Sequence, residues 1–173
     1  MWLIVTGPDK AGKSTLCKAL SDDLGLPIRK CTHDIEYGAL GSIIQEHTML
    51  ANKEENVLWD RWHYPEDIIY GAIVEHRPSV LSFYAPQVEY RMTEEIGAVY
   101  VHVTAEKITL VERYEASGDD YLSVEELMEV KDWYDYFMKN TTVPVVTINS
   151  SWCTPEGMVE SVLSNLRRLK ICK

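Results

Sequence analysis

The sequence lacks several features that mark particular classes of protein. No apolar run in the 173 residues approaches the ~20 residues of a membrane-spanning helix, and we expect no secretory leader. The cysteines show neither C-x-x-C spacing nor nearby paired histidines, so neither a zinc site nor a redox motif is indicated. We therefore expect a cytoplasmic protein with reduced thiols, and no membrane partner.

Basic residues are scarce relative to acidic ones. The chain has 17 Lys and Arg against 27 Asp and Glu, which gives a formal net charge of −10. Most of such a surface would repel a long polyanion, which argues against nucleic-acid binding and against a polynucleotide kinase. A mononucleotide remains open as a ligand, because its phosphates need only a local basic pocket. The composition, with 46% apolar and 25% charged residues, is typical of one globular domain, here residues 1–173.

Short apolar runs alternate with helical patterns along the whole chain. Strands are expected at residues 2–5, 27–31, 56–60, 98–103 and 143–148. Helices are expected at about 13–24, 35–52, 65–76, 86–96 and 105–115, after Ser123 and after Thr154. Ser123 with Glu126 has the spacing of a capping box, and Thr154 with Pro155 is typical of a helix start. This alternation predicts an α/β fold with five parallel strands between helices.

A glycine-rich stretch, GPDKAGKST at residues 7–15, lies between the first expected strand and the first expected helix. It matches the pattern G-x-x-x-x-G-K-[ST], in which glycines let backbone N–H groups face phosphate oxygens. The lysine supplies a charge for the β- and γ-phosphates, and the hydroxyl ligates Mg²⁺. The helix N-terminus points at the same anion. We predict that ATP contacts this set of residues: Gly7, Asp9, Ala11, Gly12, Lys13, Ser14, Thr15 and Arg113.

A second informative stretch is NVLWDRWHYPEDIIYG, residues 56–71. Asp60 is expected at the end of a buried strand, where it could hold Mg²⁺ opposite Ser14, directly or through water. Arg61 could bind a phosphate through two parallel hydrogen bonds. The open alternative is a surface salt bridge between Asp60 and Arg61.

These two motifs resemble those of the thymidylate kinases, with the deoxyribonucleoside kinases as close relatives. There, a P-loop of the type G-x-D-x-[AS]-G-K-[ST] is followed by an Asp-Arg-aromatic motif, matched here by Asp60, Arg61 and Trp62. VYVHVTAEKITLVERY, residues 99–114, is similar to the family's fourth strand and the turn into its lid helix. The resemblance implies a three-layer P-loop kinase fold with strand order 2-3-1-4-5 and a short lid at about 113–123.

The resemblance also implies roles for single residues. Lys13 and Ser14 would bind the donor phosphates and Mg²⁺, Asp60 would position the metal or the acceptor, and Arg61 would hold the acceptor phosphate. Asp9 would accept a hydrogen bond from the sugar 3′-hydroxyl. The expected lid carries no basic residue after Arg113. This is similar to those thymidylate kinases that lack a catalytic arginine in the lid and carry a catalytic basic residue in the P-loop. In that case Lys10 would neutralise charge on the transferred group; the alternative is an exposed loop lysine.

The base-binding part of the acceptor pocket departs from the family pattern. Met49 stands where an aromatic residue would stack on the base, and Lys53 where an arginine would reach it. Arg91 is a candidate second contact to an acceptor phosphate, with a surface ion pair as the alternative. The full acceptor set that we expect is Asp9, Arg61, Trp62, Tyr70, Met49, Lys53 and Arg91. Four aromatic residues at helical spacing are expected in the core or at a homodimer contact: Trp133, Tyr134, Tyr136 and Phe137.

The expected reaction is transfer of the γ-phosphoryl of Mg²⁺-ATP to a deoxynucleoside 5′-monophosphate, with dTMP to dTDP as the first choice. One alternative is a deoxynucleoside kinase acting on a 5′-hydroxyl, with Asp60, Asp34 or Glu36 as general base. The other is an ATP-binding regulatory domain that transfers nothing. The expected partners in either kinase are small nucleotides.

Lys13→Ala should abolish phosphoryl transfer, because it removes the ammonium group that is expected to bind the β- and γ-phosphates. The measurement is ADP formation followed together with phosphorylated product. Transfer that survives this substitution would contradict the interpretation of residues 7–15 as a phosphate-binding loop.

Overall fold

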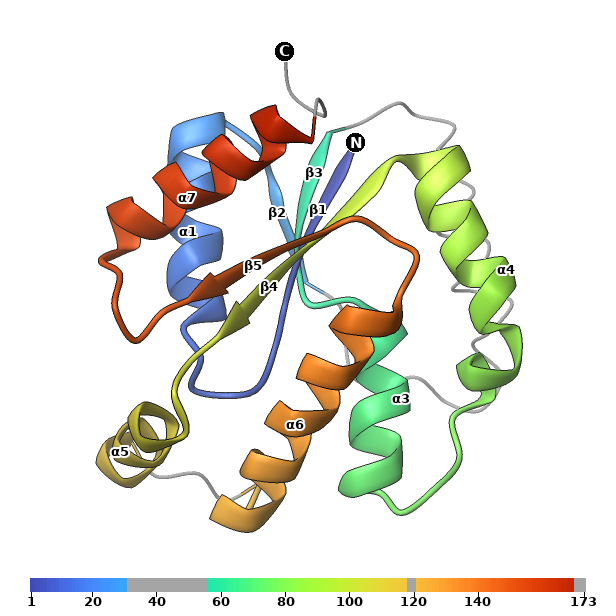
Figure 1. Cartoon of the computed structure of the whole chain (residues 1–173), viewed down its shortest axis with the longest axis vertical. Helices are drawn as coiled ribbons and strands as arrows, with labels where there is room; N and C mark the ends of the chain where they lie inside the picture. The colour runs from blue at the N-terminus through green and yellow to red at the C-terminus, as the bar shows by residue number, and fades with distance from the viewer. Residues whose placement is uncertain (31–55, 118–120, 170–173) are drawn as a thin grey trace.

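A computed structural model describes residues 1–30, 56–117 and 121–169. The expected helix at 35–52, with Met49 and Lys53, and the middle of the expected lid lie outside these residues. The described residues form a five-stranded parallel sheet in the order β2-β3-β1-β4-β5, which confirms the predicted topology (Figure 1). The strands are β1 (Trp2–Thr6), β2 (Ile28–Lys30), β3 (Val57–Asp60), β4 (Ala98–Thr104) and β5 (Val145–Asn149).

The central strand β1 is buried along its whole length. Its sequence WLIVT is apolar almost throughout, because helices cover both faces of a parallel sheet and leave no solvent-facing side. β1 pairs with β3, with Val5 opposite Asp60, and with β4, with Thr6 opposite His102. The carboxyl ends of these three strands therefore meet at one edge, where α/β proteins place their binding sites.

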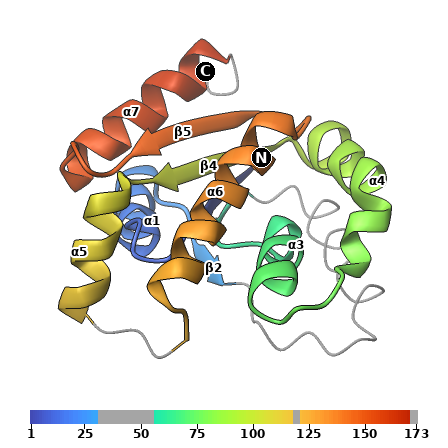
Figure 2. The same ribbon diagram turned by 60° about the horizontal axis from the view of Figure 1, so that its bottom comes forward.

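Helices cover both faces of the sheet (Figures 1 and 2). On one face α1 packs against α7, and on the other α3 packs against α6, which gives the three layers expected. The α-helices are α1 (Lys13–Leu24), α3 (His63–Ile73), α4 (Ala85–Tyr90), α5 (Lys107–Ser117), α6 (Val124–Asn140) and α7 (Pro155–Arg168). The 3-10 helix η1 (Val80–Tyr84) precedes α4, and the π-helical segment η2 (Arg91–Ile96) follows it.

The sequence signals for helix starts are confirmed in two places. Ser123 accepts a hydrogen bond from the backbone of Glu126 at 3.2 Å, and the Glu126 carboxylate accepts one from the backbone of Ser123 at 2.7 Å. Thr154 accepts from the backbone of Gly157 at 3.2 Å at the start of α7. α3 departs from expectation, because it begins at His63 and ends at Ile73.

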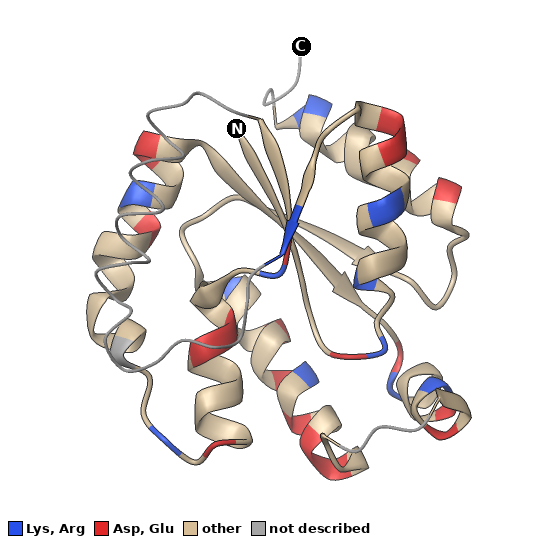
Figure 3. Cartoon of the chain, turned by 180° about the vertical axis from the view of Figure 1, so that it is seen from behind, with Lys and Arg blue, Asp and Glu red and all other residues tan. Residues whose placement is uncertain are grey.

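Charges of both signs are interspersed over the helices in Figure 3. In this view the described residues do not gather into a broad basic face. None of the helices in the described ranges combines the length and the apolar content that are needed to cross a membrane.

The P-loop glycine that follows β1 is required by close packing against β4. Gly7 has φ of 140°, and a Cβ atom on it would lie 2.1 Å from the backbone oxygen of Val103. Gly7→Ala should therefore lower the free energy of unfolding by more than ~2 kcal/mol, through both strain and overlap. Gly97→Ala is the matched control: φ there is 66° and nothing lies within 4 Å, so only the conformational cost of about 1 kcal/mol applies. Chemical denaturation of both variants tests this, and equal losses would contradict it.

Candidate nucleotide-binding site

The loop between β1 and α1 surrounds the ammonium group of Lys13. Lys10 and Gly12 have positive φ, 62° and 96°, so the chain turns sharply before α1 begins. Lys13 is only 5% exposed, and its Nζ donates a hydrogen bond to the backbone oxygen of Pro8 at 2.7 Å. Burial and the charge of Arg61 together lower the pKa of Lys13 to about 8, although the charge of Asp9 opposes the shift. An anion entering the loop would therefore meet a cation that is poorly solvated.

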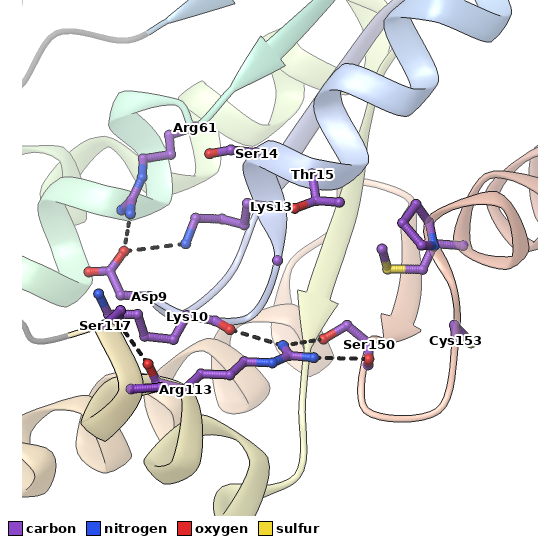
Figure 4. Close-up of a pocket in the computed structure, with 14 residues that line it drawn as sticks. Asp9, Lys10, Lys13, Ser14, Thr15, Arg61, Arg113, Ser117, Ser150 and Cys153 are labelled. Atoms are coloured by element: carbon purple, nitrogen blue, oxygen red, sulfur yellow. Dashed lines mark hydrogen bonds and ion pairs between the residues drawn. The ribbon is translucent and has the colours of Figure 1, made fainter.

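A cavity of about 620 Å³ opens over this loop (Figure 4). Its volume lies within the range of pockets that hold small molecules. The residues of the predicted site that line this cavity are Asp9, Lys10, Gly12, Lys13, Ser14, Thr15, Arg61 and Arg113. Gly7 and Ala11 are not part of the lining. Ala11 is fully buried and donates its backbone N–H to Pro8 at 3.4 Å, so it supports the loop from beneath.

Ser14 and Asp60 lie together where α1 begins and β3 ends. The hydroxyl of Ser14 donates to Oδ2 of Asp60 at 3.5 Å, and Nζ of Lys30 lies 4.0 Å from the same oxygen. The described part of the chain contains no cluster of three or more acidic, His or Cys side chains that could hold a metal ion alone. Mg²⁺ bound with a nucleotide needs only one or two protein oxygens, since phosphates and water complete its coordination. Ser14 and Asp60 therefore fit Mg²⁺ in a nucleotide complex.

Arg61 follows β3 in a left-handed backbone conformation with φ of 71°. Its backbone N–H donates to the oxygen of Val5 at 2.9 Å, which ties this turn to the end of β1. Nη1 donates to Oε2 of Glu66 at 2.9 Å, and Nη2 donates to Oδ1 of Asp9. Burial opposes its charge, but Glu66, Tyr70 and Asp9 raise the pKa of the guanidinium above its usual range. The expected alternative, a salt bridge between Asp60 and Arg61, is not among the ion pairs of the described residues.

Asp9 joins the side chains of Lys13 and Arg61. Its Oδ1 lies 3.5 Å from Nζ of Lys13 and accepts from Arg61, and its Oδ2 accepts from the hydroxyl of Tyr70 at 3.0 Å (Figure 4). Burial raises the pKa of Asp9, but the charges of Lys13 and Arg61 outweigh it and lower the pKa to about 2. Asp9 is therefore ionised and already paired with the two cations that phosphates would approach.

Arg113, on α5, holds the loop between β1 and α1 through hydrogen bonds. Nη1 donates to the backbone oxygen of Lys10 and to Oγ of Ser150, both at 3.0 Å. Nη2 donates to the backbone oxygen of Ser150 at 3.2 Å. Ser150 directly follows β5, so Arg113 links three segments around the cavity (Figure 4).

Some of the predicted acceptor residues lie away from the cavity. Trp62 is fully buried, with its ring centroid 4.3 Å from that of Trp59, so the structure places it in the core and not at the wall of the pocket. Arg91 donates to Glu95 at 3.0 Å on η2 and is not part of the lining, in keeping with the surface ion pair that was its alternative. Tyr70 is only 6% exposed, but it reaches the site through Asp9.

The four aromatic residues of α6 divide between two environments. Tyr134 is fully buried and Phe137 is half-buried, whereas Trp133 is 42% and Tyr136 63% exposed. The first pair packs in the core as expected.

Sequence reasoning missed several residues of the site. Ser150 and Cys153 line the cavity, and their place in the loop that follows β5 was a usable signal, because sites form at the carboxyl ends of strands. Glu66, which pairs with Arg61, carried no such signal, because it lies within the helical pattern of α3.

Comparisons with known proteins agree with this architecture. No protein-family model matches the sequence. The chain is 24% identical over 165 residues to the SPbeta prophage-derived protein YorR of Bacillus subtilis strain 168, covering 95% of each chain. Among solved structures it is similar to YorR from Bacillus subtilis in complex with phosphorylated GDP, with a TM-score of 0.81 at 18% identity over 100% of this chain and 99% of that one.

Two kinases from other organisms share the fold. Deoxyadenosine kinase from M. mycoides with bound dATP matches with a TM-score of 0.65 at 18% identity, over 96% of this chain and 100% of that one. A gluconokinase from Sinorhizobium meliloti 1021 matches with a TM-score of 0.58 at 17% identity, over 96% and 91%. The chain therefore has the fold of the P-loop kinases of small molecules.

Asp9→Asn should reduce stability at neutral pH and make little difference in acid. The folded-state pKa of Asp9 is about 2, below the ordinary 3.8, so its ion pairs stabilise the fold above pH 3.8 and are lost as the pH falls towards 2. The lowering of the pKa from 3.8 to about 2 corresponds to about 2 kcal/mol of stability at neutral pH. Denaturant unfolding of wild type and variant between neutral pH and pH ~2 measures this. A stability difference that stays constant over this range would contradict it.

Proposed function

We propose that this protein transfers the γ-phosphoryl group of Mg²⁺-ATP to a small nucleoside or nucleotide. The observation that carries the proposal is the arrangement of four charged or polar side chains in or beside the lining of one cavity. The Lys13 ammonium is buried beneath the loop, Ser14 and Asp60 lie together beside it, and Arg61 reaches the same cavity from the end of β3.

Such an arrangement suits phosphoryl transfer, which depends on positioning and on neutralising charge at the transferred group. Lys13 would bind the β- and γ-phosphates, and Lys10, at the wall of the cavity, would neutralise charge on the transferred phosphoryl. Ser14 and Asp60 would hold Mg²⁺, which supplies further positive charge to the phosphate oxygens. The kinases that share this fold are consistent with the proposal.

For the acceptor we propose a deoxynucleoside 5′-monophosphate, with dTMP as the first to test. Arg61 would hold the acceptor phosphate through its guanidinium, which lines the cavity and needs a fixed orientation for parallel hydrogen bonds. Asp9 lies between Arg61 and Lys13, where its carboxylate could accept from the sugar of an acceptor. The resemblance of the Asp60-Arg61 motif to that of thymidylate kinases supports this choice.

A second candidate is a deoxynucleoside kinase that phosphorylates a 5′-hydroxyl. The likeness to deoxyadenosine kinase from M. mycoides favours it. Asp60, which accepts a hydrogen bond from Ser14 of the cavity lining, would then act as general base.

The test of the proposed function is Mg²⁺-ATP turnover against a panel of nucleosides, deoxynucleosides and their monophosphates, with product identified beside ADP. Acceptor-dependent ADP formation with a monophosphate as the preferred acceptor is the expected result. Turnover only with unphosphorylated nucleosides would favour the second candidate. ADP release that is independent of every acceptor would overturn the kinase proposal.

Arg61→Ala should weaken binding of a phosphorylated acceptor far more than binding of ATP. Loss of the charged hydrogen bonds to the acceptor phosphate should raise the KM for the monophosphate on the order of a hundredfold, and the KM for ATP by less than about threefold. Arg77→Ala is the matched control, because Arg77 pairs with Asp67 and Glu75 and is not part of the cavity lining. Equal effects of the two variants on the monophosphate KM would contradict the role of Arg61.

A further inference from the structure

Glu66 is a buried carboxylate directly behind Arg61. It lies in the first turns of α3 and is only 5% exposed. Its Oε2 accepts from Nη1 of Arg61 at 2.9 Å; its Oε1 accepts from the hydroxyl of Thr6 at 3.1 Å and from the hydroxyl of Tyr134. The three donors come from the end of β3, the end of β1 and the middle of α6.

The donors explain how a charge can persist at this depth. A buried carboxylate destabilises a fold unless hydrogen bonds and an opposite charge compensate for its lost hydration. Two hydroxyls and one guanidinium supply both. They also fix the carboxylate, because Thr6 belongs to the buried central strand and Tyr134 is fully buried.

The two carboxylates that hold Arg61 differ in their access to the cavity. Asp9 lines the cavity and is 19% exposed, whereas Glu66 is not part of the lining. An anion that enters the cavity can compete with Asp9 for Nη2 of Arg61. The hydrogen bond from Nη1 to Glu66 can persist while this happens, since Glu66 lies behind the guanidinium.

We propose that Glu66 is a positioning residue that holds the Arg61 guanidinium at the wall of the cavity while an acceptor phosphate replaces Asp9 on it. This inference rests on the proposed function and adds to it the residue that orients the acceptor-binding arginine. Tyr134 and Thr6 act through Glu66, by fixing its carboxylate.

The test is Glu66→Gln, which keeps the size of the side chain and removes its charge. We expect the KM for the acceptor monophosphate to rise about tenfold or more, while the KM for ATP changes less than about twofold. A purely structural role would affect both substrates alike, or only the thermal midpoint of unfolding.

Glu89→Gln is the matched control. Glu89 is also a buried carboxylate with several donors: its Oε1 accepts from Tyr64 at 2.8 Å and from Thr141 at 2.7 Å. It is not part of the cavity lining. This variant should lose stability as Glu66→Gln does and leave the acceptor KM unchanged. Equal acceptor KM values in the two variants would overturn the inference.

Tyr134→Phe keeps the inference testable if Glu66→Gln does not fold. It removes one donor to Glu66 and leaves the pair between Glu66 and Arg61 in place, so a rise of about threefold in the acceptor KM is expected, with the ATP KM unchanged. An unchanged acceptor KM in this variant would overturn the inference.

The outcomes for the wild type separate this inference from the proposed function. A wild type that phosphorylates no acceptor overturns both. A wild type that phosphorylates monophosphates, with variants that bind them normally, overturns only the role of Glu66. A wild type that accepts only unphosphorylated nucleosides also overturns it, because no acceptor phosphate would then reach Arg61.

Discussion

Lys13, which is buried, and Arg61, which is partly buried, lie close enough that the charge of Arg61 disfavours the charge of Lys13. The charge of Arg61 contributes to the lowered pKa of Lys13, and the site remains charged because two carboxylates compensate. Asp9 bridges the cations on the cavity side, and Glu66 binds Arg61 from behind. The two cations are thus paired with one carboxylate that lines the cavity, Asp9, and one that is not part of its lining, Glu66.

The parallel sheet brings these charges together. Val5 of β1 lies opposite Asp60 of β3, so the loop that follows β1 faces the turn that follows β3. The hydrogen bond from the Arg61 backbone to Val5 holds that turn in its left-handed conformation. Arg113 then ties α5 to the loop and to the end of β5. Each of these contacts joins residues from different elements at one edge of the sheet.

The sequence was sufficient where the signal is local. Glycine spacing, the lysine at the start of α1 and the Ser123 capping box each depend on neighbouring residues, and apolar runs at regular intervals indicated the parallel sheet. The sequence was insufficient where the residues that contact each other are distant in the chain. Nothing near Glu66 indicates that it meets Tyr134, and nothing near Arg61 indicates Asp9 rather than Asp60. Trp62 was predicted to contact the acceptor, but it packs against Trp2 and Trp59, which no local pattern reveals.

In the complex that we propose, Arg61 exchanges Asp9 for an acceptor phosphate while Glu66 stays bound to it. A crystal structure with Mg²⁺, ADP and dTMP tests this most directly. We expect an acceptor phosphate oxygen within hydrogen-bond distance of Nη2 of Arg61, Asp9 displaced from it, and Nη1 still bound to Glu66. A monophosphate bound elsewhere, with Arg61 still paired with Asp9, would contradict the account.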